Sequence, residues 1–306
     1  MEFGKLQSLE GVDFSLPPDP PENELVLEQL LPSVQPRVYI GATGYNMKPW
    51  VGKWYPAGAR DRDFVRHYGA QFNTIEHNTT HYRIPDEATV ARWREEVPDD
   101  FRYCPKVPQS LSHARDLGVH SPELPLFCRA IAGLGNRLGC CFLQVSPHFS
   151  PQNLPVLERF LDKWAPDIPL AVEVRHEDFF RPTAAALRYF SLLASAGAAA
   201  VITDVAGRRD VCHMHLTNGT AMIRFVGNGL HPTDYSRIDD WALRLSTWFA
   251  KGLQTAYVFT HEPDNLLAPE LAAYAAERFQ GAAQGLQTRG PKPLGRPAQQ
   301  TSLFDI

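Results

Sequence analysis

From Arg37 onward, short apolar segments alternate with longer segments that carry apolar residues at helical spacing. The short segments have the length and the β-branched and aromatic residues typical of strands. Eight strands are predicted in this way, at residues 38–42, 72–77, 101–106, 140–145, 170–174, 199–203, 221–226 and 256–260. Between the last two, Asp239 or Asp240 is predicted to cap a helix that ends at Gly252. Eight strand–helix units predict an α/β fold, a single-domain (β/α)8 TIM-type barrel.

A doubly wound open sheet is the alternative fold, and the turn after the first strand speaks against it. Such sheets usually have fewer strands and a glycine-rich phosphate loop at that point. The segment 41–44, Gly-Ala-Thr-Gly, is too short and too poor in glycine for that loop. We therefore divide the chain into a proline-rich N-terminal arm (1–36), the barrel (37–279) and a flexible tail (280–306).

Composition narrows the classes of function. The 306 residues carry a net charge of −4 and no block of basic residues, so the barrel lacks the usual footprint of a nucleic-acid-binding surface. The five cysteines are odd in number and show no Cys-x-x-Cys spacing, which indicates free thiols in a reducing compartment. No secretory leader and no apolar run near 20 residues is evident, so we expect a cytoplasmic protein without a membrane segment.

Functional residues of such barrels gather at the C-terminal ends of the strands. In this chain those ends are unusually polar, and strand alternation points Glu173, Arg175 and Arg224 into the barrel. The candidate site residues are Tyr45, Trp50, Glu76, Asn78, Tyr82, Lys106, Gln144, Glu173, Arg175, His176, Asp204, Arg224 and His261.

Two chemical roles follow from the residue types. Glu76 and Glu173 are the candidate catalytic pair for proton transfer, because a mixed-charge pocket can separate the pKa values of two carboxylates. Lys106, Arg175 and Arg224 are candidates to hold a phosphate or carboxylate, and the other candidates would line the substrate pocket. The alternative is that these groups only satisfy one another as a buried ion-pair network.

A divalent metal is the less favoured interpretation of the same strand ends. His176, Asp204, His261 and Glu262 have suitable side chains, as does Glu173, but their spacing fits no metal-binding motif. We therefore assign no metal ligand and leave the cofactor open. The sequence does not indicate an oligomeric state.

Several of these segments together resemble the YecE-like family of barrel proteins of unknown function, domain of unknown function 72. The similar motifs are spread over residues 38–279 and lie at 41–45, 72–85, 101–106, 142–145 and 172–176. The resemblance implies a TIM-type barrel with a polar pocket and no established activity. By this resemblance, eight residues fall on characteristic positions of the family: Glu76, Asn78, Tyr82, Lys106, Glu173, Arg175, His176 and Arg224.

The chain departs from that family pattern on two strands. The seventh strand reads Arg-Phe-Val-Gly at 224–227, where the family pattern is Arg-x-His-Gly. The eighth ends in Thr-His-Glu at 260–262, where paired asparagines are common. This side of the pocket is therefore the part that the resemblance defines least.

The last residues predict a partner. Gln300, Leu303 and Phe304 form a Gln-x-x-Leu-Phe pattern that resembles the pentapeptide with which bacterial replication and repair proteins bind the DNA sliding clamp. A glutamine amide can make several hydrogen bonds, and an adjacent Leu-Phe pair can fill an apolar pocket. Chance occurrence, or packing of the tail on the barrel, is the alternative.

Two functional hypotheses remain after these steps. The first is an acid/base enzyme tethered to the clamp, acting on a small anionic substrate that carries phosphate or carboxylate, such as a nucleotide or nucleic-acid fragment. The second is a non-catalytic module that binds such a ligand and is recruited to replication or repair sites.

Overall fold

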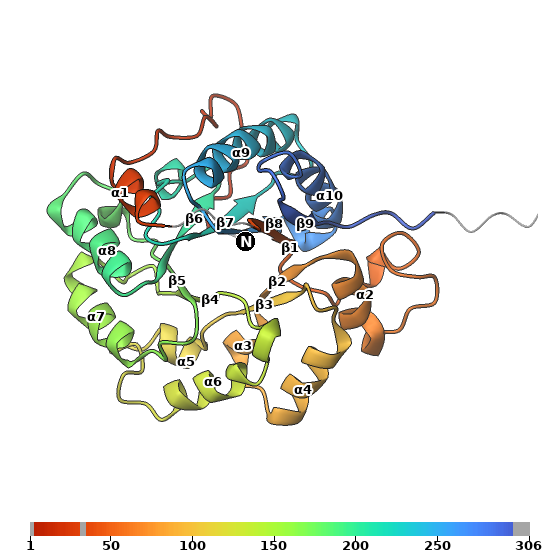
Figure 1. Ribbon diagram of the computed structural model, residues 1–306, viewed down its shortest axis with the longest axis horizontal. Coiled ribbons are helices and arrows are strands. Elements are labelled where there is room, and N and C mark those ends of the chain that lie inside the picture. The colour runs from red at the N-terminus through yellow and green to blue at the C-terminus, as the bar shows by residue number, and fades with distance from the viewer. Residues whose placement is uncertain (1–2, 31–34, 296–306) are drawn as a thin grey trace, which may run out of the picture.

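The computed structural model describes residues 3–30 and 35–295, and places strands around a central axis with helices outside them (Figure 1). Each of the eight predicted strands is present, with ends within two residues of the prediction. The strands are β1 Arg37–Gly41, β2 Thr74–His77, β3 Arg102–Pro105, β4 Cys141–Gln144, β5 Leu170–Glu173, β6 Ala199–Asp204, β7 Thr220–Val226 and β8 Thr255–His261, with an additional β9 Gln287–Arg289.

Helices connect the strands and cover their outer side. They are α1 Glu22–Glu28, α2 Phe64–Gln71, α3 Thr79–Tyr82, α4 Glu87–Glu96, α5 Gln109–Ser112, α6 Glu123–Ala132, α7 Leu154–Lys163, α8 Ala184–Ser195, α9 Pro232–Ala250 and α10 Ala268–Phe279. The predicted start of α9 is wrong, since Asp239 and Asp240 lie inside it. Its N-cap is His231, whose ring accepts from the Thr233 N–H, and Pro232 fixes the first helical turn.

The strands form two parallel sheets. Seven strands pair in the order β4-β5-β6-β7-β8-β1-β9, and β2 pairs with β3. Between β3 and β4 only isolated bridges form, from Tyr103 to Leu138 and from Lys106 to Phe142. The hydrogen-bonded ladder is therefore not continuous, and the predicted closed barrel is not present as one closed sheet.

Side chains replace the missing ladder between β1 and β2. The Asn73 amide accepts from the Ile40 N–H at 2.6 Å and donates to the Val38 carbonyl at 3.1 Å. At the next position the two strands come so close that a Cβ on Gly41 would lie 2.3 Å from the Thr74 carbonyl oxygen. Glycine at 41 and asparagine at 73 thus hold these two edges together.

The first part of the predicted flexible tail is ordered, which corrects that prediction. Strand β9 pairs with β1, and Arg289 makes two hydrogen bonds, of 2.8 and 2.9 Å, to the Asp100 carboxylate. A Cβ on Gly290 would lie 2.3 Å from Cβ of Ala276, so the chain packs closely on α10 there. The docking motif at Gln300, Leu303 and Phe304 lies outside the described residues.

Alternation along the strands separates an inner core from an outer one. On β7, Met222 packs with interior residues such as Phe142 and Tyr257, whereas Ile223 and Phe225 pack against the helices. Arg224 lies two residues beyond Met222 and therefore faces the interior, above this apolar layer. The fold itself thus directs a charged side chain into the barrel axis.

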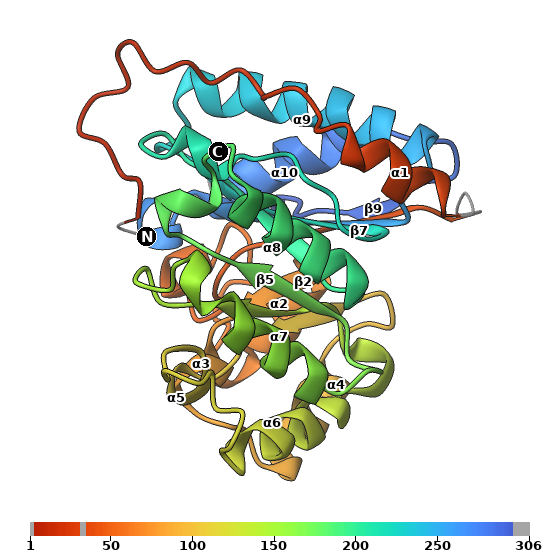
Figure 2. The ribbon, with the colours of Figure 1, turned by 90° about the vertical axis from the view of Figure 1, so that its left-hand side faces the viewer.

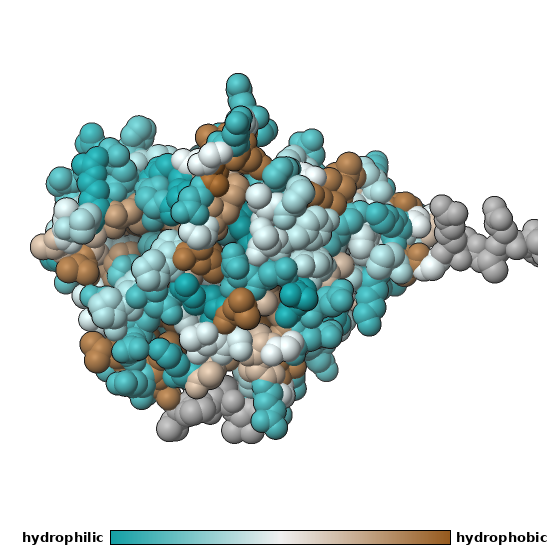
Figure 3. Space-filling model, turned by 90° about the horizontal axis from the view of Figure 1, so that it is seen from above, coloured by the Kyte–Doolittle hydropathy of each residue, from teal (hydrophilic) through white to brown (hydrophobic). Residues whose placement is uncertain are grey.

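The N-terminal arm wraps the outside of the fold. Figure 2 shows it running beside α9 to α1. Asp19 accepts from Arg244 and from the Trp248 indole, and Asn23 bonds the backbone at Met214 and Leu216, each at 2.8 Å. In the view of Figure 3, hydrophobic residues are interspersed among hydrophilic ones. Among the described helices, none combines the length and apolarity needed to cross a membrane.

Candidate functional site

Polar side chains from six strand ends meet on the barrel axis, and we call them the strand-end cluster. In the pairing of β4 with β5, Gln144 lies beside Glu173, and β7 brings Arg224 opposite both β2 and β5. All members are buried or nearly so. The cluster comprises Glu76, Asn78, Lys106, Gln144, Glu173, Arg175, Arg224 and His261.

Glu76 is a fully occupied hydrogen-bond acceptor. Arg224 grips both of its oxygens, with Nε 2.8 Å from Oε2 and Nη2 2.9 Å from Oε1. His261 Nε2 lies 2.9 Å from Oε2, and Asn78 Nδ2 donates to Oε1 at 3.0 Å. Four donors match the four lone-pair sites of a carboxylate. Glu76 is therefore built to orient Arg224.

Glu173 shares Arg224 with Glu76 but keeps spare capacity. Arg224 Nη1 donates to its Oε2 at 2.6 Å, and Arg175 Nε donates to its Oε1 at 2.9 Å. One arginine thus bridges the two carboxylates that were predicted to transfer protons. Because each Glu173 oxygen accepts from one donor among the residues that the structure describes, lone pairs remain on it for a further contact.

The arginines decide the protonation of both carboxylates. Burial alone would raise the pKa of Glu76, but Arg224 and His261 outweigh it and hold that pKa well below the usual value. For Glu173, burial is likewise outweighed by Arg224 and Arg175, so its pKa is lowered. Both side chains are ionised at neutral pH, and neither is prepared to donate a proton.

Lys106 differs from the two arginines. Its Nζ donates to Gln144 Oε1 at 3.1 Å, the same oxygen that accepts from Arg175 Nη2 at 3.1 Å. Among the described residues Lys106 lies in no ion pair, although its side chain is only 8% exposed. Burial lowers the pKa of the ammonium, and the carboxylates of Glu76 and Glu173 offset this only partly.

Comparison with known proteins identifies the family of this chain. Residues 39–296 match the family model described as "Protein of unknown function DUF72". The chain belongs to the DUF72 family. It is 31% identical over 252 residues to the UPF0759 protein YecE of Escherichia coli K12, covering 76% of this chain and 89% of that protein. The UPF0759 protein YecE of Escherichia coli O157:H7 gives the same values.

Solved DUF72 structures share the fold. A crystal structure of a DUF72 family protein from Enterococcus faecalis V583 gives a TM-score of 0.62 at 18% identity, over 80% of this chain and 98% of that one. A second crystal structure of that protein gives 0.63, over 84% and 100%. The family resemblance seen in the sequence is confirmed. The DUF72 family is described as of unknown function, so a function for this chain has to be inferred from the geometry of the strand-end cluster.

Besides Asp204, four predicted residues of this DUF72 protein lie outside the cluster. Trp50 is packed in the core, where its ring meets Tyr55, Tyr68 and Phe72 and its Nε1 donates to a backbone carbonyl, and its substrate contact stays a prediction. The other three are Tyr45, which is half-buried against that core, His176, which accepts from the Asp178 N–H at 3.3 Å, and Tyr82, which is exposed.

Asp204 belongs to a second buried group, here called the helix cluster, which also contains Arg209, Asp234, Arg237 and Trp241. Asp204 Oδ1 accepts from Arg237 Nη1 at 3.1 Å and from Arg209, and its Oδ2 accepts from the Trp241 indole at 2.9 Å. Arg237 Nη2 also reaches Asp234 at 2.6 Å. With its oxygens occupied on the α9 side, Asp204 is not placed for substrate.

Two residues near the cluster were not predicted from the sequence as part of the site. Phe3 of the arm lies over the Arg175 guanidinium, 4.4 Å from its centre, and no local pattern predicts that long-range contact. Glu262, considered there only as a metal ligand, is 5% exposed and packs on Gly227, where a Cβ would lie 2.1 Å from its Oε1. Burial raises the pKa of Glu262 to about 7.

The metal candidates do not assemble. Glu173 and His261 reach the cluster from different strands, His176 turns to Asp178, and Asp204 is held in the helix cluster. No group of three or more His, Cys, Asp or Glu side chains is arranged to hold a metal ion in residues 3–30 and 35–295. The cofactor question stays open on these grounds.

Proposed function

We propose that this chain is an acid/base enzyme that binds a small phosphate- or carboxylate-bearing substrate at Lys106. The observation that carries the proposal is a buried ammonium without a carboxylate partner among the described residues. An unpaired buried charge is costly, typically by several kcal/mol, unless a ligand supplies the opposite charge. Lys106 Nζ already donates one hydrogen bond to Gln144, and a bound anion would accept the others.

The cluster also suggests how a proton could move. Lys106 has a lowered pKa, so it gives up its proton more readily than an exposed lysine and can act as donor or acceptor to the bound substrate. Glu173 has free lone pairs and can act as a base, whereas all lone pairs of Glu76 accept hydrogen bonds from its four donors. The pairing of Glu76 with Glu173 as acid and base stays a prediction, and Lys106 is the better-placed proton-transfer group.

Anion binding can be tested with inorganic phosphate and two lysine variants. Lys106→Met keeps the length of the side chain and removes its charge, so we expect calorimetric phosphate affinity to fall at least about ten-fold, or roughly 1.4 kcal/mol. Lys163→Met is the matched control, because Lys163 is exposed on α7. Equal phosphate affinity in the wild type and both variants would remove the basis of the proposal.

A non-catalytic ligand-binding module is the second candidate, favoured by one observation. Both carboxylates are held by Arg224, which gives a rigid ionised frame suited to recognition. The two candidates differ in the fate of a bound ligand. Compounds that raise the melting temperature of the wild type would be incubated with the wild type and with Lys106→Met. Mass spectrometry would detect any product. Product formed by the wild type and not by the variant indicates that the protein is an enzyme.

We further propose that the two sheets act as one TIM-type (β/α)8 barrel. The order of strands, the bridges from β3 to β4 and the Asn73 contacts across β1 and β2 support this. Asn73→Ala should then loosen that seam, because it leaves the Ile40 N–H and the Val38 carbonyl without their partner. Faster amide exchange at Ile40, without change at β6, is the expected result.

For the cellular role, we propose a cytoplasmic protein tethered to the DNA sliding clamp through Gln300, Leu303 and Phe304. The sequence pattern of these residues supports the tether, and the five free cysteines agree with a reducing compartment. We expect the full chain to bind a purified bacterial clamp at micromolar affinity or tighter, about 8 kcal/mol. The Leu303→Ala, Phe304→Ala double variant should lose this binding, and unchanged binding would contradict the tether.

A further inference from the structure

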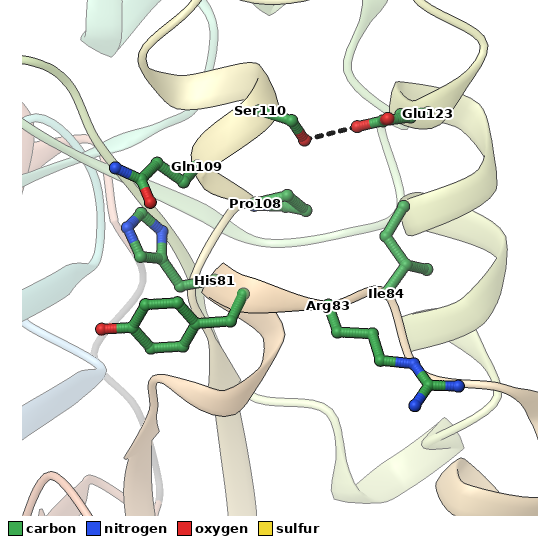
Figure 4. Close-up of a pocket in the computed structure, with 8 residues that line it drawn as sticks. His81, Arg83, Ile84, Pro108, Gln109, Ser110 and Glu123 are labelled. Carbon is green, nitrogen blue, oxygen red and sulfur yellow. Dashed lines mark hydrogen bonds between the residues drawn. The ribbon is translucent and has the colours of Figure 1, made fainter.

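A pocket of about 650 Å³ opens between the segments that follow β2 and β3. Figure 4 shows His81, Arg83 and Ile84 on one side of it and Pro108, Gln109, Ser110 and Glu123 on the other. Its volume lies in the range of small-molecule sites, which run from about 300 to 1,000 Å³. A separate pocket lies between the N-terminal arm and the ends of β7 and β8, where Leu6 and Leu9 line it with His261.

Tyr82 is the lining residue that stands out. It is 81% exposed, the most of any large hydrophobic side chain in the described part of the chain. The short helix that carries it is nevertheless fixed, since Thr80 Oγ1 bonds the carbonyls of His77 and Lys106 and His81 Nδ1 lies 2.9 Å from the Val107 carbonyl. The ring is thus presented to solvent from a rigid support.

The pocket and the anion site share strand β3. Lys106 holds the tyrosine-bearing helix through its carbonyl and provides the buried ammonium through its side chain. Pro108, two residues after Lys106, lines the pocket, and the Lys106 carbonyl accepts from Thr80, two residues before Tyr82. A molecule in the pocket can therefore extend an anionic group toward Lys106.

We propose that this pocket is a subsite for the flat ring of the substrate, which makes nucleoside phosphates the substrate class. An exposed tyrosine on a fixed support offers a stacking face, and the Gln109 amide can bond the polar edge of a base. The Ser110 hydroxyl already donates to Glu123 and can only accept from the base. The phosphate would then occupy the site at Lys106. This inference rests on the proposed anion binding at that residue.

The experiment compares ligands that share a phosphate and differ in the ring. Calorimetry would measure the affinity of the wild-type protein for each of the four ribonucleoside 5′-monophosphates and for ribose 5-phosphate. We expect at least one nucleotide to bind about ten-fold tighter than ribose 5-phosphate, since stacking of a base on an aromatic side chain supplies that much. Tyr82→Ala should remove this advantage and leave ribose 5-phosphate affinity unchanged.

Two control variants separate stacking from general effects. Tyr82→Phe keeps the ring and should bind as the wild type does, and Leu243→Ala changes another exposed hydrophobic side chain, on α9, far along the sequence from the pocket. Equal affinity of the wild type for nucleotides and ribose 5-phosphate overturns the ring subsite while phosphate binding at Lys106 stands. Absence of binding by every ligand overturns both the subsite and the proposed function.

Discussion

The strand-end cluster and the helix cluster are both buried groups of charges, but they differ in balance. In the helix cluster two aspartates meet two arginines, and Arg237 is also covered on its faces by Phe14 and Phe225, at 4.8 and 4.2 Å. In the strand-end cluster two glutamates meet two arginines and a lysine. The first cluster satisfies itself. In the second, the Lys106 ammonium hydrogen-bonds only the Gln144 amide within the described part of the chain.

This difference distinguishes a structural ion-pair network from a ligand site. Buried ion pairs with complete hydrogen bonding contribute to the unique fold and need nothing more. A surplus cation at the C-terminal ends of parallel strands is a different case, because α/β folds bind their ligands at that edge of the sheet. The following changes test whether the two clusters behave so differently.

The largest effect is expected from Arg237→Met in the helix cluster. Asp204 and Asp234 would lose a shared partner in a buried place, so the free energy of unfolding should fall by about 3–5 kcal/mol. Urea denaturation measures this. Phosphate affinity should not change in the protein that remains folded.

Arg188→Met provides the control for that change. Arg188 is an exposed residue paired with Glu158 at 3.6 Å, so its loss should alter stability by less than about 1 kcal/mol. A stable Arg237→Met protein, or one that loses phosphate binding, would show that the two clusters are not separate in role.

Glu262→Gln should give the next largest effect, and one that depends on pH. The pKa of Glu262 is raised from 4.5 to about 7 by burial, so the folded state holds its proton more tightly than the unfolded state does. Its contribution to stability is full below pH 4.5 and is lost as pH rises through about 7. The variant should therefore match the wild type at pH 4 and exceed it by up to about 3 kcal/mol at pH 8.

Denaturant unfolding at several pH values checks this expectation. Glu95→Gln, at an exposed position on α4, is the matched control and should follow the wild type within about 0.5 kcal/mol at each pH. A constant difference between Glu262→Gln and the wild type from pH 4 to pH 8 would contradict the raised pKa.

The smallest stability effect is expected from Lys106→Met. Removing a buried charge that lacks a carboxylate partner costs little and relieves desolvation, so unfolding free energy should stay within about 1 kcal/mol of the wild type or rise. Thermal unfolding without ligand measures it. A loss as large as that of Arg237→Met would mean that Lys106 is structural.

The sequence predicted the strands well because each is a short apolar run with a clear boundary. It also identified eight members of the strand-end cluster, since strand alternation fixes which side chains face inward. It did not predict β9, whose polar Gln-Thr-Arg segment carries no strand signal and pairs only because the edge of β1 is available.

Two predicted site residues lie outside the strand-end cluster because partners distant in sequence decide where their side chains turn. Trp50 follows β1 but enters an aromatic core with Tyr68 and Phe72, and Asp204 ends β6 but turns to Arg237 on α9. Whether a polar side chain at a strand end faces the axis or the helices depends on such contacts, which periodicity alone does not contain.

The most direct test of the account is diffraction from crystals of the wild-type protein and of Lys106→Met soaked in selenate, a phosphate-sized anion with an anomalous signal. We expect an anomalous selenium peak about 3–4 Å from Lys106 Nζ in the wild type, within hydrogen-bond reach of the selenate oxygens, and none there in the variant. A wild-type crystal with selenate bound elsewhere and no peak at Lys106, or an unchanged peak in the variant, would contradict it.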